Sequence, residues 1–296
     1  MIEPASMLLV ARLVFNLAAL LLWGGSVCLL LIADRSLRAA FWQRLFRWGV
    51  GAAALAGLST FVTLPMLTAS LGGGWKEALD VNMLTLVVTR TVVGSAWGGQ
   101  LAACVALGAV LLVRPLRRPA GVGVASALML ATLTVSGHTA MHDGVIGMLH
   151  RFNDWGHLLA GGFWLGALVP VVLLLRCLKA ADTRAAAIQA LIRFSSVGHL
   201  VVALAVLTGI MNTWLVVGGL PLDSDVLYQR SLWLKVALVA LLIVIALYNR
   251  YRLVPRLSRD PGALAILRRV SIAEIVILVM VVALVSWFGT LSPGHG

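Results

Sequence analysis

The feature that most constrains this chain is a succession of apolar blocks, each about 20 residues long, separated by short arginine-rich connectors. A helix rises about 1.5 Å per residue, so a block of this length crosses a hydrocarbon core roughly 30 Å thick. Backbone N–H and C=O groups find no water in that core, and a helix satisfies them internally. The pattern therefore predicts an all-α protein, a polytopic membrane helix bundle. The alternating ten-residue segments typical of membrane β-barrels are absent from the sequence.

Composition supports the same class. The 296 residues are 61% hydrophobic and 11% charged, with a mean hydropathy of +1.00, whereas soluble domains are roughly 45–50% apolar and about 25% charged. The formal net charge is +12. Its basic residues lie in connectors rather than on an amphipathic face with interleaved aromatic residues, so we expect a lipid bilayer as partner and no nucleic acid.

We expect eight transmembrane helices in a single membrane domain. Residues 1–120 would form a first half with three spans, and residues 121–296 a second half with five spans and the histidine-rich segment. The expected spans are 7–33, 49–70, 91–113, 121–137, 152–175, 194–217, 232–248 and 271–290.

The connectors differ in charge. The first, third, fifth and seventh hold 17 of the 23 basic residues, while the acidic residues lie mainly in the others. Basic connectors stay in the cytoplasm, so both termini are expected outside. This predicts a multi-pass protein of the bacterial inner membrane, whose outer face meets the periplasm.

Several functional classes find no support. Cys28, Cys104 and Cys177 lie far apart without CxxC spacing, which excludes a disulfide framework, a zinc finger and c-type haem attachment. No nucleotide-binding motif is present. The connectors are too short for a soluble catalytic domain, so we do not expect an enzyme.

A weak internal repeat relates the two parts of the chain. Placing residues 17–35 on 158–176 aligns Trp23 with Trp164 and Gly25 with Gly166. A four-plus-four parallel repeat fits this alignment, and chance similarity between leucine-rich segments fits it equally well.

Four of the six histidines fall in residues 136–176. His138 and His142 end the fourth expected span and share a face if a helix continues through them. His150, Asp154 and His157 open the fifth span at positions i, i+4 and i+7, on one helical face. The two groups would therefore meet across a short loop, where the membrane meets water.

These side chains suit a transition metal, because imidazole and carboxylate bind copper, zinc and nickel, and the thioether of Met141 favours Cu(I). We expect His138, His142 and His157 as ligands, with Asp154 and Met141 as secondary candidates. His157 would lie roughly 10 Å deep and is either a ligand or a hydrogen-bonding group between helices. Asp154 either orients a histidine or pairs with Arg12, and His150 is either a ligand or a headgroup contact.

Two further histidines and a glycine pair belong to this interpretation. Gly162 and Gly166 form a GxxxG surface for close helix contact. His199 lies near the cytoplasmic end, too far from His157 to share an ion with it, and marks either an inner station or a hydrogen bond between helices. His295 would be an exposed outer ligand.

The motifs SGHTAMHDG, HRFNDWGHLLAGGFWLGALVP and LYQRSLWLKVALVALLIVIALYNRYRLVPRL follow one another over about the last 160 residues. In this order they resemble the CopD/PcoD copper-resistance membrane proteins. The resemblance implies an eight-span inner-membrane protein that accepts a copper ion from a periplasmic CopC-type copper protein and moves it inward. It also implies roles for His138, in the SGH motif, and for His157, in the HLLA motif.

We therefore expect a protein that binds copper at its periplasmic face and transports it towards the cytoplasm. Two alternatives stay open at this point. One is a b-type haem electron carrier or quinone oxidoreductase, with His138 and His157 as axial ligands. The other is a membrane scaffold that stores or delivers copper.

Overall fold

The computed structural model describes residues 3–178, 180–258 and 262–294, and these ranges are helical with no strand. Seven of their helices are long and apolar enough to cross a membrane. They are α1 (Pro4–Ile32), α2 (Arg35–Gly72), α4 (Val92–Leu112), α6 (Gly144–Cys177), α7 (Ala181–Val217), α8 (Leu227–Tyr248) and α9 (Ala263–Phe288). The expected all-α, multi-span architecture is confirmed.

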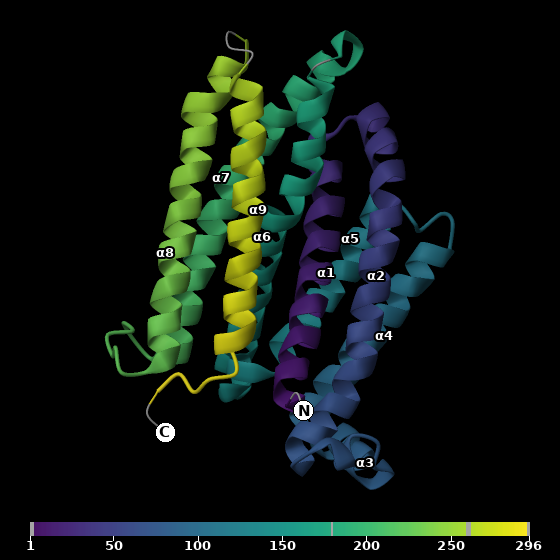
Figure 1. Ribbon diagram of the computed structural model, residues 1–296, viewed down its shortest axis with the longest axis vertical. Helices are drawn as coiled ribbons and strands as arrows, with labels where there is room; N and C mark the ends of the chain where they lie inside the picture. Colours follow the sequence, from purple (N-terminus) through teal and green to yellow (C-terminus); the bar gives the residue numbers. More distant parts are fainter. Residues whose placement is uncertain (1–2, 179, 259–261, 295–296) are drawn as a thin grey trace.

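The fourth expected span is shorter than the others. It forms α5 (Pro119–Thr132), followed by the 3₁₀ turn η2 (Leu133–Val135), together about 27 Å long by helical rise. Figure 1 shows α5 running between the two ends of the bundle, and both chain termini at the same end. The structure thus holds seven clear candidate spans and one short apolar helix, α5, inside the bundle.

A second short helix, α3 (Val81–Arg90), lies outside the main bundle near the N-terminal end (Figure 1). It follows the 3₁₀ turn η1 (Trp75–Glu77) in the connector between α2 and α4. Asp80 caps α3, because its carboxylate accepts a hydrogen bond from the backbone N–H of Met83 at 2.8 Å. This is the short helix that a connector of this length can hold.

The turn from α1 to α2 is held by charged side chains. Asp34 caps α2 by accepting the N–H of Leu37 at 2.9 Å. Arg38 reaches back and donates to the carbonyls of Leu29, Leu30 and Ala33 at 3.2, 3.2 and 2.9 Å. These carbonyls at the end of α1 have few or no partners within their own helix. Arg38 therefore closes α1 as well as adding positive charge to the connector.

Helices α1 and α6 form the centre of the molecule and bury more of their length than the other spans. Their backbones touch at glycines: a Cβ on Gly24 would lie 2.1 Å from the carbonyl oxygen of Gly162, and one on Gly166 would lie 2.7 Å from Cα of Gly24. Trp23 Nε1 also donates to the carbonyl of Leu159 at 2.8 Å. The expected close contact at Gly162 and Gly166 is confirmed, with α1 as its partner.

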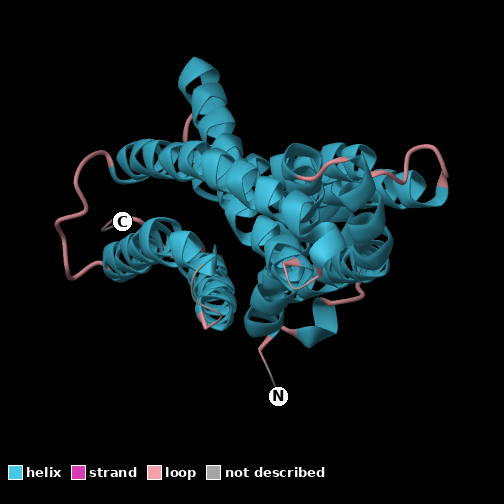
Figure 2. Cartoon of the chain, turned by 90° about the horizontal axis from the view of Figure 1, so that it is seen from above, coloured by secondary structure: helices cyan, strands magenta, loops and turns pink. Residues whose placement is uncertain are grey.

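The other helices gather around this pair. Figure 1 shows α2, α4 and α5 on the side of α1, and α7, α8 and α9 on the side of α6, and the view from above in Figure 2 shows α8 and α9 set to one side of the bundle. The two repeat-related segments, in α1 and α6, thus pack against each other. The repeat itself and the division near residue 120 stay predictions, and α5 packs chiefly on α1 and α4.

Candidate functional site

The loop between α5 and α6 carries His138 and His142 at the end of the bundle where the termini lie, here called the terminal end (Figure 1). Its central turn is η3 (Gly137–Met141), a 3₁₀ helix. Gly137 and Gly144 bracket it with φ angles of +78° and +62°, which favour glycine. The α-helix therefore does not continue through His138 and His142, and His142 has an extended backbone.

The loop instead folds back onto the first turns of α6. Nδ1 of His142 lies 3.3 Å from Nδ1 of His150, and their ring centroids are 5.4 Å apart. Gly147 allows this approach, because a Cβ there would lie 2.0 Å from the carbonyl oxygen of His142. His150 is only 1% exposed, so it belongs to the interior of this end and not to a lipid-facing surface.

His138 lies in the same region. Its ring packs edge-on against Tyr228 of α8 at a centroid distance of 5.1 Å. Its Nε2 is buried and has no hydrogen-bond partner among the described residues. Burial lowers the pKa of His138 from its ordinary value of 6.5, which favours the neutral imidazole. His138 and His142 belong to this loop, and His150 lies against it; we call these three residues the loop histidines.

The loop histidines do not amount to a preformed metal cage. Within the described residues, no three His, Cys, Asp or Glu side chains are close enough to hold one ion together. Met141 is 54% exposed at the end of η3. His142 and His150 are the pair that the structure brings within reach of a single ion, and His138 and Met141 are near them in the same loop.

Asp154 and His157 face a different neighbour, helix α7. Asp154 Oδ1 accepts a hydrogen bond from Asn212 at 2.8 Å, and Asn153 donates to Asn212 Oδ1 at 2.6 Å. The stripe expected on one face of α6 thus divides, with His150 towards the loop and Asp154 towards α7. Asp154 pairs with Asn212 and not with Arg12.

His157 hydrogen-bonds to α7 through one ring nitrogen. Its Nδ1 lies 3.1 Å from the carbonyl oxygen of Ala205 and 3.0 Å from the hydroxyl of Thr208. A carbonyl can only accept, so Nδ1 carries the proton and Nε2 keeps its lone pair. Such a bond fixes the tautomer and orientation that metal-binding histidines need. The expected hydrogen bond between helices is therefore present and leaves Nε2 available as a ligand.

Sequence reasoning missed part of this polar cluster. Asn153 lies next to Asp154 and also donates to the carbonyl of Thr208 at 2.9 Å. An asparagine beside an aspartate within an apolar span was the available signal, because polar groups in hydrocarbon need partners.

His199 lies near the opposite, arginine-rich end of the bundle. Its Nδ1 bonds to the carbonyl of Ser195 at 2.8 Å, within its own helix, and it makes no hydrogen bond to another helix of the described residues. The exposed side chain lines a partly open cavity. His295 lies outside the described residues.

Comparisons with known proteins agree with this architecture. Residues 1–148 match the family model described as Copper resistance protein D-like, N-terminal domain, and residues 188–288 match Copper resistance protein D. The chain is 35% identical to Copper resistance protein D of Pseudomonas syringae pv. tomato over 264 residues, 84% of each chain. It is 29% identical to Inner membrane protein YebZ of Escherichia coli K12, over 84% of this chain and 85% of that protein.

Two more distant similarities concern the share of a larger protein that this chain covers and the fold that it shares with a solved structure. Copper transport protein CutJ of Bacillus subtilis is 26% identical over 69% of this chain, which corresponds to 39% of that larger protein. The structure of bd oxidase from Geobacillus thermodenitrificans superposes with a TM-score of 0.58 at 10% identity, covering 98% of this chain and 87% of that one. At this identity the likeness concerns the helical fold alone.

The relatives are named for copper resistance, copper transport and the inner membrane, and the family is one of membrane transport and resistance proteins rather than enzymes. With apolar spans along most of its length, the chain is a multi-pass inner-membrane protein. It belongs to the copper resistance protein D family.

Proposed function

We propose that this protein binds copper among the loop histidines at the terminal end and transports it towards the arginine-rich end. The distance between His142 and His150 carries the proposal. Two nitrogens that bind one ion at about 2.0 Å each, with a tetrahedral angle between them, lie about 3.3 Å apart. The two Nδ1 atoms are 3.3 Å apart before any ion is added. His138, whose buried Nε2 has no partner, and Met141 are proposed as the further ligands.

The second step of the proposal takes copper to Asp154 and His157. Both residues are on α6, one and two turns beyond His150, and Nε2 of His157 makes no hydrogen bond with the described residues. Conduction requires sites that hold an ion well enough to admit it and weakly enough to release it. Two successive sites, each with few protein ligands, meet that requirement.

The direction follows from charge. The arginine-rich connectors identify the cytoplasmic side by the positive-inside rule, which puts the terminal end in the periplasm. Copper would then enter from the periplasm, supplied by a CopC-type copper protein. The names of the relatives, which refer to copper resistance and copper transport, support copper as the transported ion.

The proposal is tested on purified protein by copper titration and by copper uptake into proteoliposomes. Replacing His150 with Ala should weaken copper binding by at least about tenfold, because the loss of one residue that binds the metal or orients a ligand lowers metal affinity on this scale. His199→Ala changes a histidine at the other end and should leave this binding intact. Equal affinities for the two variants would contradict the proposed site.

The same sample distinguishes transport from the alternatives. Uptake into vesicles that fails with His150→Ala supports transport, whereas binding without uptake would indicate a copper store or delivery scaffold. A Soret absorption band in the purified protein would indicate haem and would overturn the assignment of the histidines to copper.

A further inference from the structure

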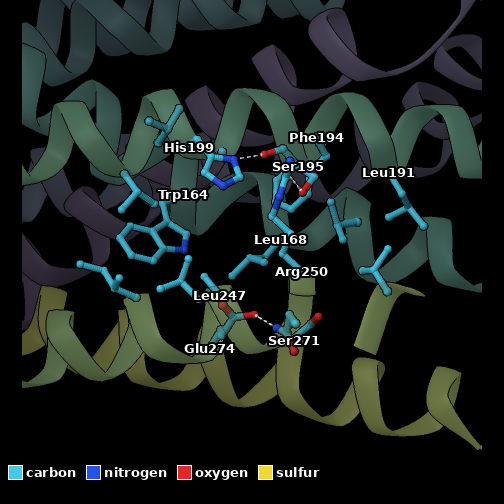
Figure 3. A pocket seen from close by; sticks show the side chains of 18 of the residues that line it. Trp164, Leu168, Leu191, Phe194, Ser195, His199, Leu247, Arg250, Ser271 and Glu274 are labelled. Carbon is cyan, nitrogen blue, oxygen red and sulfur yellow. Dashed lines mark hydrogen bonds between the residues drawn. The ribbon is translucent and has the colours of Figure 1, made fainter. Parts of the chain in front are cut away.

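A partly open cavity of about 310 Å³ lies near the arginine-rich end, among α6, α7, α8 and α9. Figure 3 shows Trp164 and Leu168 of α6 facing it from one side, with Phe194 and His199 of α7 and Leu247 of α8 around it. Its walls are mainly apolar. This volume is within the range of small-molecule sites, about 300–1,000 Å³, and none of its residues belongs to the proposed copper path.

A small set of polar groups gathers on one side of the cavity. Asn249 is the first residue of a π-helical turn, η4 (Asn249–Leu253), which continues α8; such turns occur often at functional sites. Its Nδ2 donates to Oε2 of Glu274 at 2.9 Å. Its Oδ1 is buried and accepts no hydrogen bond. Asn249 is 9% exposed and Glu274 3%, so neither group is satisfied by bulk water.

Two more groups have unused hydrogen-bonding capacity. Nδ1 of His199 donates to the carbonyl of Ser195, so its Nε2 is left as an acceptor. Ser271 lines the cavity, and its hydroxyl makes no hydrogen bond with the described residues. Asn249 Oδ1 is a buried acceptor without a donor among the described residues, which costs free energy. The exposed His199 also lines this cavity, and its Nε2 offers a second acceptor. A ligand that fits must therefore bring hydrogen-bond donors.

We infer that this cavity binds a neutral amphipathic molecule whose head is an aromatic ring carrying hydroxyl groups, of the phenol or hydroquinone class. Ring hydroxyls supply the missing donors, the flat ring suits the aromatic side chains of Phe163 and Trp164, and an apolar tail suits the aliphatic walls. The Glu274 carboxyl group and the Arg250 guanidinium both line the cavity, so its polar groups are not of a single sign that would select a charged head. The guanidinium of Arg250 already donates to the hydroxyl of Ser195.

The test compares two probes of nearly the same shape, 4-hexylphenol and its methyl ether 4-hexylanisole, which differ in the hydroxyl donor. Saturable binding to the full-length protein is measured by equilibrium dialysis, with the same detergent concentration on both sides. The phenol should bind about tenfold more tightly than the ether, the ratio expected from one or two hydrogen bonds to the acceptors of the cavity. His199→Phe removes one acceptor and should reduce this ratio.

A glycine in the cavity wall provides a blocking variant. Gly198 lines the cavity, and a Cβ there would meet nothing within 4 Å, so Gly198→Leu can fill the space without a backbone clash. It should abolish saturable phenol binding while leaving copper binding unchanged. Gly57→Leu is the matched control, because Gly57 on α2 also has open space around a Cβ and does not line the cavity.

Three results would overturn the inference. They are equal binding of phenol and ether, unchanged phenol binding by Gly198→Leu, and tighter binding of hexylamine or hexanoate than of the phenol. Because these measurements contain no copper, they stand or fall separately from the proposed copper transport.

Discussion

Two nitrogen atoms 3.3 Å apart, on His142 and His150, are the most specific observation at the scale of single residues. They come from different segments, one from a loop after a 3₁₀ turn and one from the buried first part of α6. Without a metal, one imidazole must donate a proton to the other. A cation that replaces this proton keeps both nitrogens in place, so binding requires little rearrangement of the pair.

If both histidines bind the same ion, their effects on affinity should not add. His142→Ala and His150→Ala should each weaken copper binding by at least about tenfold, and the double variant should bind little more weakly than either single variant, because residues that act as a unit are non-additive. Copper titration of the four proteins checks this. Met148→Ala, an exposed methionine on the same helix, is the control. Additive losses would mean that the two imidazoles act at separate sites.

His138 should make the stability of the metal-free protein depend on pH. Burial lowers its pKa in the folded state below the ordinary value of 6.5, so the unfolded chain binds the proton more readily. The stabilising contribution is complete above pH 6.5 and is lost as the pH falls below it towards the folded-state pKa. The unfolding midpoint in detergent should fall in that window, and it should fall less steeply for His138→Gln. Identical profiles would show that other groups dominate.

At the scale of helices, the contact between α1 and α6 depends on the absence of side chains. Gly24 faces backbone atoms of Gly162 and Gly166, and a backbone carbonyl cannot move aside as a flexible side chain can. The sequence signal for this contact was the GxxxG spacing of Gly162 and Gly166, which is a general signature of close helix packing.

Gly24→Ala should therefore destabilise the protein although it adds only a methyl group. The new Cβ would lie 2.1 Å from the carbonyl oxygen of Gly162, so the helices must separate, at a cost of about 1–3 kcal/mol or more. Thermal unfolding in detergent should show a clear decrease in midpoint. Gly57→Ala, with nothing within 4 Å of the added atom, should leave the midpoint unchanged or raise it, and equal behaviour of the two variants would contradict the close contact.

The sequence predicted the helices better than it predicted their contacts. Apolar length located the seven candidate spans of the described residues, because the requirement to satisfy the backbone in hydrocarbon is local. The conformation of the loop from Gly137 to Gly144 is harder to predict, because two glycines with positive φ angles and a 3₁₀ turn replace a continuing α-helix. The partners of Asp154 and His157 depend on how α6 is rotated against α7, which long-range packing decides. For the same reason, the sequence does not distinguish a metal ligand from a headgroup contact at His150.

At the scale of the whole molecule, α5 decides how many times the chain crosses the membrane. Its 14 residues and the following turn are shorter than the other spans, yet with α5 the two termini lie at the same end (Figure 1). If α5 crosses, the C-terminus and the loop histidines share the periplasmic side. If α5 does not cross, the part of the chain after α5 has the opposite membrane orientation, relative to the part before α5, from the one expected with eight crossings.

Reporter fusions test this count directly. Alkaline phosphatase fused to the C-terminus of the full chain should be active, because it folds only in the oxidising periplasm, and the same fusion after Arg117, in an arginine-rich connector, should be inactive. A fluorescent protein that folds in the cytoplasm should give the opposite pattern. Phosphatase activity at both positions or at neither would contradict eight crossings with both ends outside.

The glycine contact between α1 and α6 also restricts how the molecule can change shape. Where two backbones touch, no side chains are available to repack, so α1 and α6 should stay fixed relative to each other. Any motion that opens a route for the ion should then occur in α7, α8 and α9. When copper is added, the rate of amide hydrogen exchange should change in those three helices and stay constant in α1 and α6. The lipid that surrounds α8 and α9 would then take part in the motion, and membrane thickness or fluidity would set its rate.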